Sequence, residues 1–531
     1  MNCSLSSISN HTSGFDFGEI YDVYQHLNQT CSAESDIFFT GSRMLTLATC
    51  VLITQTSYSI WTGWTPYSIS DIWARIVTWK LPLAQLVAQF PRPPLGFAVE
   101  TLTMIHLLGD PIDSVTSMLV TFKKCDARVK EAKKACSDVE IEPQHPEYDR
   151  TWKALAIIMV SYDECGKPEN GDAVCSDFKK MKHGSRFDEY QDVLEETAFA
   201  LASDRSTKSL PIAFAETFFI GGWIIALLKA AASEPNPTNW VNVEAQSVAI
   251  SAMYLWVTSA VLFGAIIGVS QTEESIPRIL QRYEVDMPDV KEEGNEVLDN
   301  IGRRPSASYR EEIGWCDKAT NRAEHGGAYS WRPEKWKTAS RGVDNSSSVL
   351  LLFSLVAIVA VGCSFVTAAV LSSQVPPKGI SCRHVMEFMM FFFWLLSFAL
   401  ECVVERWMQK IFWVVFWKDM FFALSTIILV LVTQWGIMNS CACWSMWGLR
   451  GLHLPQLPEV EPELMYYIRH VAPWITFMAI LFQLVFSAAV AWKYWDAVRV
   501  FIQRDDGMPN LGWKKKRTQV EQDVESKNGS R

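Results

Sequence analysis

The sequence predicts an all-α polytopic membrane protein with about seven transmembrane helices and a re-entrant or interfacial helical hairpin. Three observations predict this fold: apolar blocks of bilayer length, an N-terminal segment with glycosylation sequons, and a basic C-terminal end. The mean hydropathy of +0.07 is low for such a protein because polar stretches separate the apolar blocks. Those stretches hold most of the net charge of −10, and this acidic balance argues against a nucleic-acid binder.

The apolar blocks are long enough to cross a bilayer, because a transmembrane helix needs about 20 apolar residues. One globular core would not bury six blocks of this length. A weaker apolar run over residues 44–61 is expected to be the first span, since no cleavable signal peptide precedes it. The six clear blocks are residues 210–232, 247–269, 348–371, 385–404, 419–438 and 471–492.

Residues 1–43 are predicted to be a lumenal, glycosylated segment. Asn2, Asn10 and Asn28 each open a glycosylation sequon, and three sequons within thirty residues indicate exposure to the glycosylation machinery. The alternative is a polar tail in which the sequons occur by chance. With seven crossings, this assignment places the N-terminus outside and the C-terminus in the cytosol.

The C-terminal tail, residues 493–531, gives an independent indication of the same orientation. It is rich in basic residues, and lysine and arginine near span ends favour the cytoplasmic side. Arg406, Lys410 and Lys418 lie between the fifth and sixth predicted spans and agree with that assignment. Both ends of the chain therefore predict the same topology.

This topology assigns Cys382, Cys441 and Cys443 to the lumenal side, where disulfides form. Cys441 and Cys443 are too closely spaced for a zinc knuckle. We expect a structural disulfide from Cys382 to one of these two cysteines in preference to a metal site. The sequence predicts no metal and no cofactor.

The remaining polar regions are predicted to form one hairpin and two inserts. Residues 73–122 are apolar in patches, and two short helices over 95–108 and 112–122 would suit a re-entrant or interfacial hairpin. If both pieces crossed fully, the chain would have nine spans with the same parity. Residues 123–209 and 271–347 are predicted to be cytosolic inserts.

Carboxylates inside the predicted spans are the first candidates for chemistry, because charged groups in a membrane are costly and usually face a cavity or a partner. Glu216 lies in the second span, and Glu387 and Glu401 lie on one face of the fifth. We expect Glu387 and Glu401 to face a shared interior pocket, with one of them the functional acid. The alternative is an interhelical hydrogen bond or a salt bridge with Lys229 or Lys493.

A second constellation lies in the predicted hairpin. His106 and Asp110 stand one helical turn apart, and a histidine–carboxylate pair can move protons. Asp110 and Asp113 resemble half of an aspartate-rich magnesium motif for diphosphates, although magnesium needs further ligands. Asp110 could instead cap the helix that Pro111 opens, and we favour this structural role.

Aromatic residues are frequent, and the run 389–394 lies beside the glutamates of the fifth span. Aromatic faces stabilise cations, so such a run could line a cavity for a carbocation or a hydrophobic ligand. Packing against lipid is the favoured interpretation. No Walker A loop, GxSxG elbow, HExxH helix or dinucleotide-binding glycine pattern occurs, which disfavours ATP-driven transport and zinc proteolysis.

Two segments carry a resemblance to known proteins. His106-Leu-Leu-Gly-Asp-Pro-Ile-Asp113 and Gln434-Trp-Gly-Ile-Met-Asn-Ser-Cys-Ala-Cys-Trp-Ser445 resemble recurring segments of polytopic proteins from filamentous fungi. The chain is also similar, over a minor part of its length, to transmembrane terpene cyclases of the ascochlorin and ascofuranone type. The resemblance implies acid-triggered cyclisation, in which an intramembrane carboxylic acid protonates an epoxide or alkene of a prenyl chain. It carries no catalytic position over to this sequence.

Three classes of function follow. The first is a membrane-embedded enzyme of secondary metabolism that cyclises a lipophilic prenylated (terpenoid or meroterpenoid) substrate, and the second is a proton-coupled transporter or channel. The third is a seven-span receptor, which the long cytosolic inserts make least attractive. A missing internal repeat slightly disfavours a transporter. The expected partners are the bilayer, in the endoplasmic reticulum or plasma membrane, and a lipophilic small molecule.

Overall fold

The computed structural model is almost entirely helical over the residues that it describes. Its only strands there are two-residue segments, β1 (Arg205–Ser206) and β2 (Val269–Ser270), which pair antiparallel. The described residues are 72–73, 76–90, 97–141, 147–164, 168–181, 187–206, 209–232, 248–270, 275–287, 347–374, 380, 383–407, 412–434 and 466–502. The first predicted span, residues 44–61, lies outside them.

The chain divides into two compact units. Unit 1 comprises Met1–Thr121, Thr207–Ile266 and Asn321–Lys493, and unit 2 comprises Phe122–Ser206, Ile267–Thr320 and Tyr494–Arg531. The helices of unit 1 are η1 (Ile76–Lys80), α5 (Leu81–Ala88), α6 (Phe97–Gly109), α11 (Ser209–Ala232), α13 (Trp256–Ile267), α19 (Ser347–Gln374), α20 (Arg383–Trp407), α21 (Phe412–Gln434), η4 (Tyr467–Val471) and α24 (Ala472–Lys493), together with the start of α7 (Pro111–Asp138).

Among the described residues, five helices of unit 1 are long and apolar enough to cross a membrane, as in an integral membrane protein. They cover Val248–Ile267, Ser348–Ser373, His384–Val403, Val414–Thr433 and Arg469–Lys493, and α11 contains a shorter apolar stretch, Pro211–Ile225. The predicted start of the sixth span at residue 419 was wrong. Its helix, α21, begins at Phe412, so Lys418 lies inside the helix and not in a cytosolic loop.

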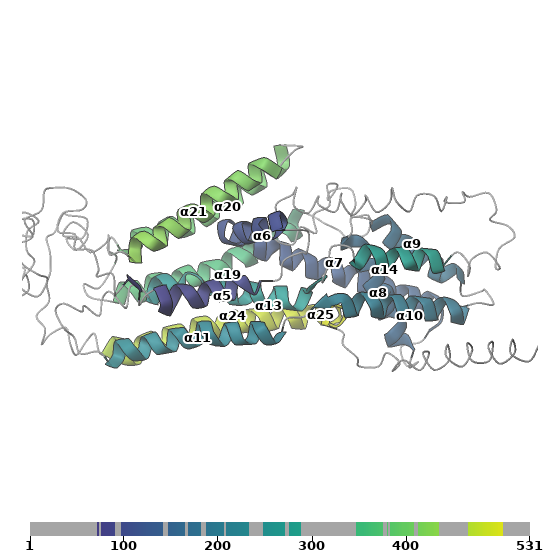
Figure 1. Ribbon diagram of the computed structural model, residues 1–531, viewed down its shortest axis with the longest axis horizontal. Coiled ribbons are helices and arrows are strands. Elements are labelled where there is room, and N and C mark those ends of the chain that lie inside the picture. The colour runs from purple at the N-terminus through teal and green to yellow at the C-terminus, as the bar shows by residue number, and fades with distance from the viewer. Residues whose placement is uncertain are drawn as a thin grey trace, which may run out of the picture. The chain divides into compact units, whose positions relative to one another are not determined.

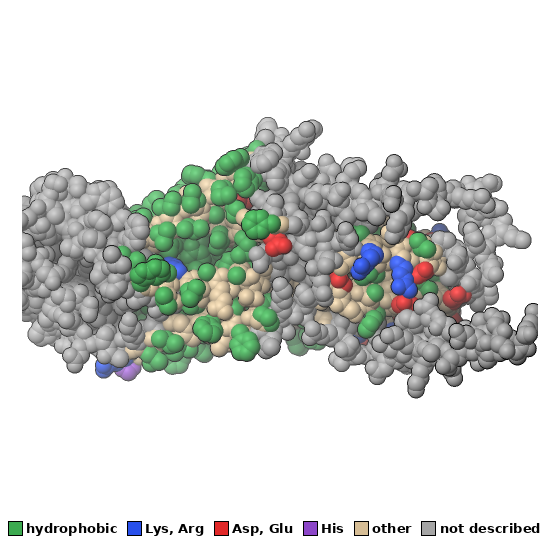
Figure 2. Space-filling model, viewed as in Figure 1, with side chains coloured by type: hydrophobic (Ala, Val, Ile, Leu, Met, Phe, Trp, Pro, Cys, Tyr) green, Lys and Arg blue, Asp and Glu red, His purple; other side chains and the backbone are tan. Residues whose placement is uncertain are grey.

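Several spans expose their apolar side chains and bury their small or polar ones. In α19, Leu351, Leu355 and Val359 are more than half exposed, whereas Ala360 and Ser364 are buried. Hydrophobic side chains likewise cover most of the described surface over the bundle in Figure 2. A helix with this pattern is stabilised by a surrounding hydrocarbon phase, which agrees with the assignment of these helices to a membrane.

In the bundle, helices pack both against their neighbours in the sequence and against helices far away in the sequence (Figure 1). α21 packs on α6 and α20, α19 packs on α20 and α24, and α11 packs on α5. The span Val248–Ile267 is the central one, because 83% of its apolar window is buried, against 39% or less for each of the other four.

The hairpin predicted over residues 73–122 differs from the structure at its second helix. The first predicted helix corresponds to α6, but α7 continues past the expected end at residue 122 to Asp138. The continuation keeps a buried stripe at helical spacing, formed by Cys125, Val129, Ala132 and Cys136. Charged residues on the other faces made this part of the sequence look like the beginning of a separate insert.

Unit 2 has its own core. Trp152, Tyr162, Phe178 and Tyr190 are among its largest fully buried side chains. Arg205 closes one edge of this core, since its guanidinium donates to Glu164 at 2.7 Å and to the Ile267 carbonyl at 3.1 Å. Its helices are the rest of α7, α8 (Tyr148–Glu164), α9 (Pro168–Met181), α10 (Phe187–Asp204), α14 (Ser275–Asp286) and α25 (Trp495–Ile502).

Candidate functional site

A group of buried charged side chains lies where α6, α7, α20 and α21 meet in unit 1. Lys418 is at its centre, and we call the group the Lys418 cluster. Its members are Asp110 from the α6–α7 junction, Ser397 and Glu401 from α20, and Lys418 and Asp419 from α21. His106 and Asp113 extend it.

The ammonium group of Lys418 lies among three carboxylates. Its Nζ is 2.8 Å from Asp110 Oδ2, 2.9 Å from Glu401 Oε2 and 2.8 Å from Asp419 Oδ1. It also donates to the Ser397 hydroxyl at 3.0 Å, and that hydroxyl donates to Asp110 at 2.9 Å. The Lys418 side chain is only 6% exposed, so these contacts replace its hydration.

His106 connects Asp419 to a further carboxylate, Asp113. Its Nδ1 lies 2.7 Å from Asp419 Oδ2 and its Nε2 lies 3.1 Å from Asp113 Oδ2. Both ring nitrogens face acceptors, an arrangement that a protonated imidazole satisfies fully because it has two N–H donors. The expected pairing of His106 with Asp110 was therefore wrong: only a backbone bond joins this pair, from the Asp110 amide to the His106 carbonyl.

Asp110 has two roles at once. Its Oδ1 accepts the backbone N–H of Asp113 at 3.0 Å, so Asp110 caps α7 at the position before Pro111, and the predicted capping role is confirmed. Its Oδ2 accepts from Ser397 and Lys418. The start of α7 is thereby attached to both α20 and α21.

Gly109 allows α6 to approach α21 closely at this position. A Cβ atom added to Gly109 would lie 2.5 Å from the backbone oxygen of Asp419 and 3.1 Å from its Cα. Only a residue without a side chain permits this backbone contact. The contact holds Asp419 next to His106 and thus fixes the geometry of the cluster.

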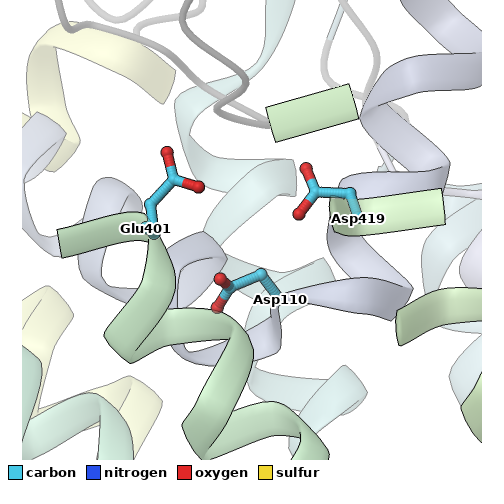
Figure 3. Close-up of side chains that lie close together, drawn as sticks. All are labelled: Asp110, Glu401 and Asp419. Atoms are coloured by element: carbon cyan, nitrogen blue, oxygen red, sulfur yellow. The ribbon is translucent and has the colours of Figure 1, made fainter. Parts of the chain in front are cut away.

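The carboxylates outnumber the cations around Lys418. Asp110, Asp113, Glu401 and Asp419 carry four formal negative charges, and Lys418 and a protonated His106 carry two positive ones. The carboxyl groups of Asp110, Glu401 and Asp419 converge in Figure 3, with oxygens within 4.8 Å of one another, a spacing that could hold a metal ion. The Lys418 ammonium already lies within 2.9 Å of each of them, so a metal would have to displace it.

Glu401 is the least stabilised of these carboxylates as an anion. Asp110 accepts three hydrogen bonds and Asp419 is bonded to His106. Glu401 lies within ion-pair distance of Lys418, but neither of its oxygens has an aligned hydrogen-bond donor in the described part of the chain. It is 1% exposed, so little water compensates for this.

The expectation that Glu387 and Glu401 face one shared pocket was wrong. The hydroxyl of Ser372, on α19, donates to Glu387, whereas Glu401 faces Lys418. Both carboxylates are buried on the same stripe of α20, as their spacing predicted. However, fourteen residues of helix separate them by about 21 Å along the axis.

Glu216 is a third buried carboxyl, on α11. The hydroxyl of Thr258 donates to its Oε2 at 3.2 Å, and its Oε1 has no hydrogen-bond partner among the described residues. The side chain of Lys229 lies outside the described part of the chain. In the aromatic run of α20, Met389 and Phe392 are exposed while Met390 and Trp394 are buried. The run therefore divides between an exposed face and the helix interface.

Sequence reasoning missed Lys418, Asp419 and Ser397. Lys418 and Asp419 interrupt an apolar stretch that begins with α21 at Phe412. Lys418 was assigned to the preceding loop and Asp419 to the first position of the predicted span. One signal could have identified Lys418 and Asp419. They form a charged pair between two apolar segments, and the two segments together are as long as one transmembrane helix. Asn2, Asn10, Asn28, Cys382, Cys441 and Cys443 lie outside the described residues.

Comparison with known proteins adds no family to this picture: no family model, curated protein or solved structure matches the chain.

Proposed function

We propose that the protein is a proton-coupled membrane transporter and that the Lys418 cluster is its proton-binding site. The observation that carries this proposal is the surplus of carboxylates around one buried lysine. An uncompensated charge in a buried membrane site is very costly, so such a site binds a proton or changes its pairing. Proton binding is thus linked to the packing of α6, α20 and α21.

Glu401 is the proton acceptor in this proposal. Its carboxylate has the weakest set of partners, so it is the first to accept a proton from water. Protonation removes its charge attraction to Lys418, which then remains with Asp110 and Asp419. The contact between the end of α20 and the start of α21 is weakened as a result. Loss of the proton restores it, which gives the two states that coupled transport requires.

The topology proposed with this function has unit 2 in the cytosol. The connectivity supports an even number of crossings between β1 and α25. β1 and α25 both belong to unit 2; α11 follows β1 directly, and α24 leads into α25. Residues 44–61 would add one crossing and place Asn2, Asn10 and Asn28 on the opposite side. The basic tail would then lie in the cytosol, as positively charged ends usually do.

The proposal is tested by the movement of charge after a pH jump. Purified protein in vesicles on a solid-supported membrane should give a transient current when the external pH changes, without any added substrate. Glu401→Gln should remove most of this current, because it removes the proton acceptor. Asp188→Asn, at an exposed position of α10, is the matched control and should retain it. A wild-type protein without a transient current, or an unchanged current in Glu401→Gln, overturns the proposal.

Acid-triggered cyclisation of a prenylated substrate is a second candidate, and Glu216 is the residue that favours it. A cyclase acid must be uncharged to donate a proton, and Glu216 has a hydroxyl partner and no cation among the described residues. At Glu401 the Lys418 ammonium, 2.9 Å away, opposes the uncharged form, whereas no described cation opposes it at Glu216.

Microsomes containing the protein test this second candidate with a prenylated phenol epoxide. Cyclised product that disappears in Glu216→Gln but persists in Glu401→Gln would favour the cyclase over the transporter. Absence of product with wild-type protein would argue against the cyclase and leave the charge-movement experiment unaffected.

A further inference from the structure

The central span of the bundle, Val248–Ile267, is interrupted at the start of α13. The amides of Met253, Tyr254 and Leu255 donate to carbonyls three residues earlier, at 3.1–3.3 Å, instead of four. α13 resumes at Trp256. Short stretches of such tight turns within a helix often mark a functional position, and transporters place substrates where a spanning helix is broken.

The local sequence does not force this interruption. The segment 251–256 reads Ser-Ala-Met-Tyr-Leu-Trp and contains neither glycine nor proline, the residues that usually break a helix. All six residues are buried. Packing around the segment therefore sets its conformation. Trp394 of α20 contributes aromatic contacts to this packing.

Trp394 packs edge-on against two aromatic rings of the interrupted segment. Its ring centroid lies 6.0 Å from that of Tyr254 and 6.0 Å from that of Trp256, with interplanar angles of 77° and 80°. Tyr254 is also hydrogen-bonded to Thr426 of α21. The interruption thus contacts an aromatic ring of α20 and a hydroxyl group of α21.

Three buried donors at this position have no acceptor among the described residues. They are the hydroxyl of Ser251 and the indole N–H groups of Trp256 and Trp394. A buried donor without a partner is rare in native proteins and calls for an explanation such as an absent ligand or a change of state. Three of them beside one helix interruption point to a ligand that supplies acceptors.

We propose that the interrupted segment and Trp394 form a binding site for an uncharged, largely apolar small molecule that carries a carbonyl, ether or hydroxyl oxygen. The oxygen accepts hydrogen bonds from the indole N–H groups, and the aromatic rings pack on the apolar part. An anion is disfavoured because Ser251, Tyr254, Trp256 and Trp394 include no cation. A cation is disfavoured because the unpaired groups are donors.

This inference rests on the proposed transport function and names the class of its solute. Trp394 lies seven residues from both Glu387 and Glu401 on the buried stripe of α20, about 10 Å from each along the helix. A ligand held there would lie beside the helix whose end responds to protonation of Glu401. In this structure the rings close on one another, so ligand entry requires the interrupted segment to move away from α20.

Benzophenone and diphenylmethane are suitable probes, because they share two phenyl rings and differ in one carbonyl oxygen. In nanodiscs, benzophenone should raise the melting temperature of the wild-type protein more than diphenylmethane does. Irradiation should attach benzophenone to the segment 251–256 or to the neighbourhood of Trp394, which peptide mass spectrometry locates.

The double variant Trp256→Phe, Trp394→Phe keeps two aromatic rings and removes both indole donors. It should bind benzophenone about tenfold more weakly, because two neutral hydrogen bonds are lost. Trp474→Phe, at an exposed position of α24, is the control and should bind as wild type. Equal stabilisation by both probes, or unchanged benzophenone binding in the double variant, overturns the proposal.

The transient current after a pH jump separates this proposal from the proposed function. Trp474→Phe, which lies in neither site, should keep both the current and the benzophenone binding. Carbonyl-selective binding by a protein that gives no current would retain the ligand site and reject proton coupling. A normal current without carbonyl-selective binding would retain proton coupling and reject the ligand site.

Discussion

Lys418 is held in the bundle mainly by charge pairing, since its side chain is 6% exposed and three carboxylates lie within 2.9 Å of its ammonium. The free energy of the buried ammonium group therefore depends on the neighbouring carboxylates more than on contact with water. Removing one member of a buried ion pair costs about 3–5 kcal/mol because the other charge is left uncompensated. Removal of the lysine is the most severe case, because it leaves three acids together.

We accordingly expect Lys418→Met to lower the melting temperature of the protein in detergent strongly. Glu401→Gln should have a much smaller effect, because two carboxylates still face the ammonium. Lys180→Met is the control, since Lys180 is 65% exposed and exposed ion pairs contribute little. Similar melting temperatures for Lys418→Met and Lys180→Met would show that the cluster adds nothing to stability.

Gly109 offers a second test at the scale of one residue. Gly109→Ala places a Cβ 2.5 Å from a backbone oxygen of Asp419, so α6 and α21 must move apart. We expect the variant to lose the pH-jump current and to melt at lower temperature. Gly221→Ala is the matched control, because a Cβ at Gly221 meets nothing within 4 Å. A Gly109→Ala protein with normal current and stability would mean that the close contact is unimportant.

At the scale of elements, α25 is attached to α8 by charges that depend on pH. Arg499 of α25 donates to Asp149 at 2.8 Å, and Trp152 of α8 donates to the same carboxylate at 3.0 Å. Burial opposes the charge of Asp149, but the hydrogen bonds from Arg499 and Trp152 outweigh it and lower the pKa of its carboxyl. A second ion pair joins α25 to α7, since Lys133 of α7 lies 2.7 Å from Asp496 of α25.

The sign of the pH dependence follows from that lowered pKa. The stabilisation is present above the ordinary pKa of an aspartate and is lost as the pH falls through the lower folded-state value. We expect the difference in melting temperature between wild type and Asp149→Asn to shrink toward zero as the pH falls through this range. Asp188→Asn should show no such trend. A constant difference at all pH values would contradict the assignment.

For the whole molecule, the proposed topology makes a prediction about glycosylation. When the protein is expressed in a eukaryotic membrane, treatment with a glycosidase should reduce its mass. Replacing Asn2, Asn10 and Asn28 by Gln should abolish the reduction. An N-terminus that proteases reach in intact vesicles with the cytosolic side outward would reverse the topology.

The sequence predicted the helical class and the approximate positions of the spans, because length and hydropathy are local properties. It misplaced the start of α21, since Lys418 and Asp419 resemble a loop unless their partners are known. Those partners are remote: His106 and Asp419 are 313 positions apart. The sequence likewise identified His106, Asp110 and Asp113 as a group but paired them wrongly, because pairing depends on how α20 and α21 pack against α6.

The separation of Asp110 from Lys418 also has a consequence during synthesis. The two residues are 308 positions apart, which a ribosome covers in about 15–60 s at 5–20 residues per second. Throughout that interval the α6–α7 junction is in place without the ammonium that its aspartate binds. The junction therefore reaches its final packing only after the last third of the chain has been synthesised. Premature termination or slow translation in that third should leave α6 and the start of α7 incompletely packed and exposed to membrane quality control.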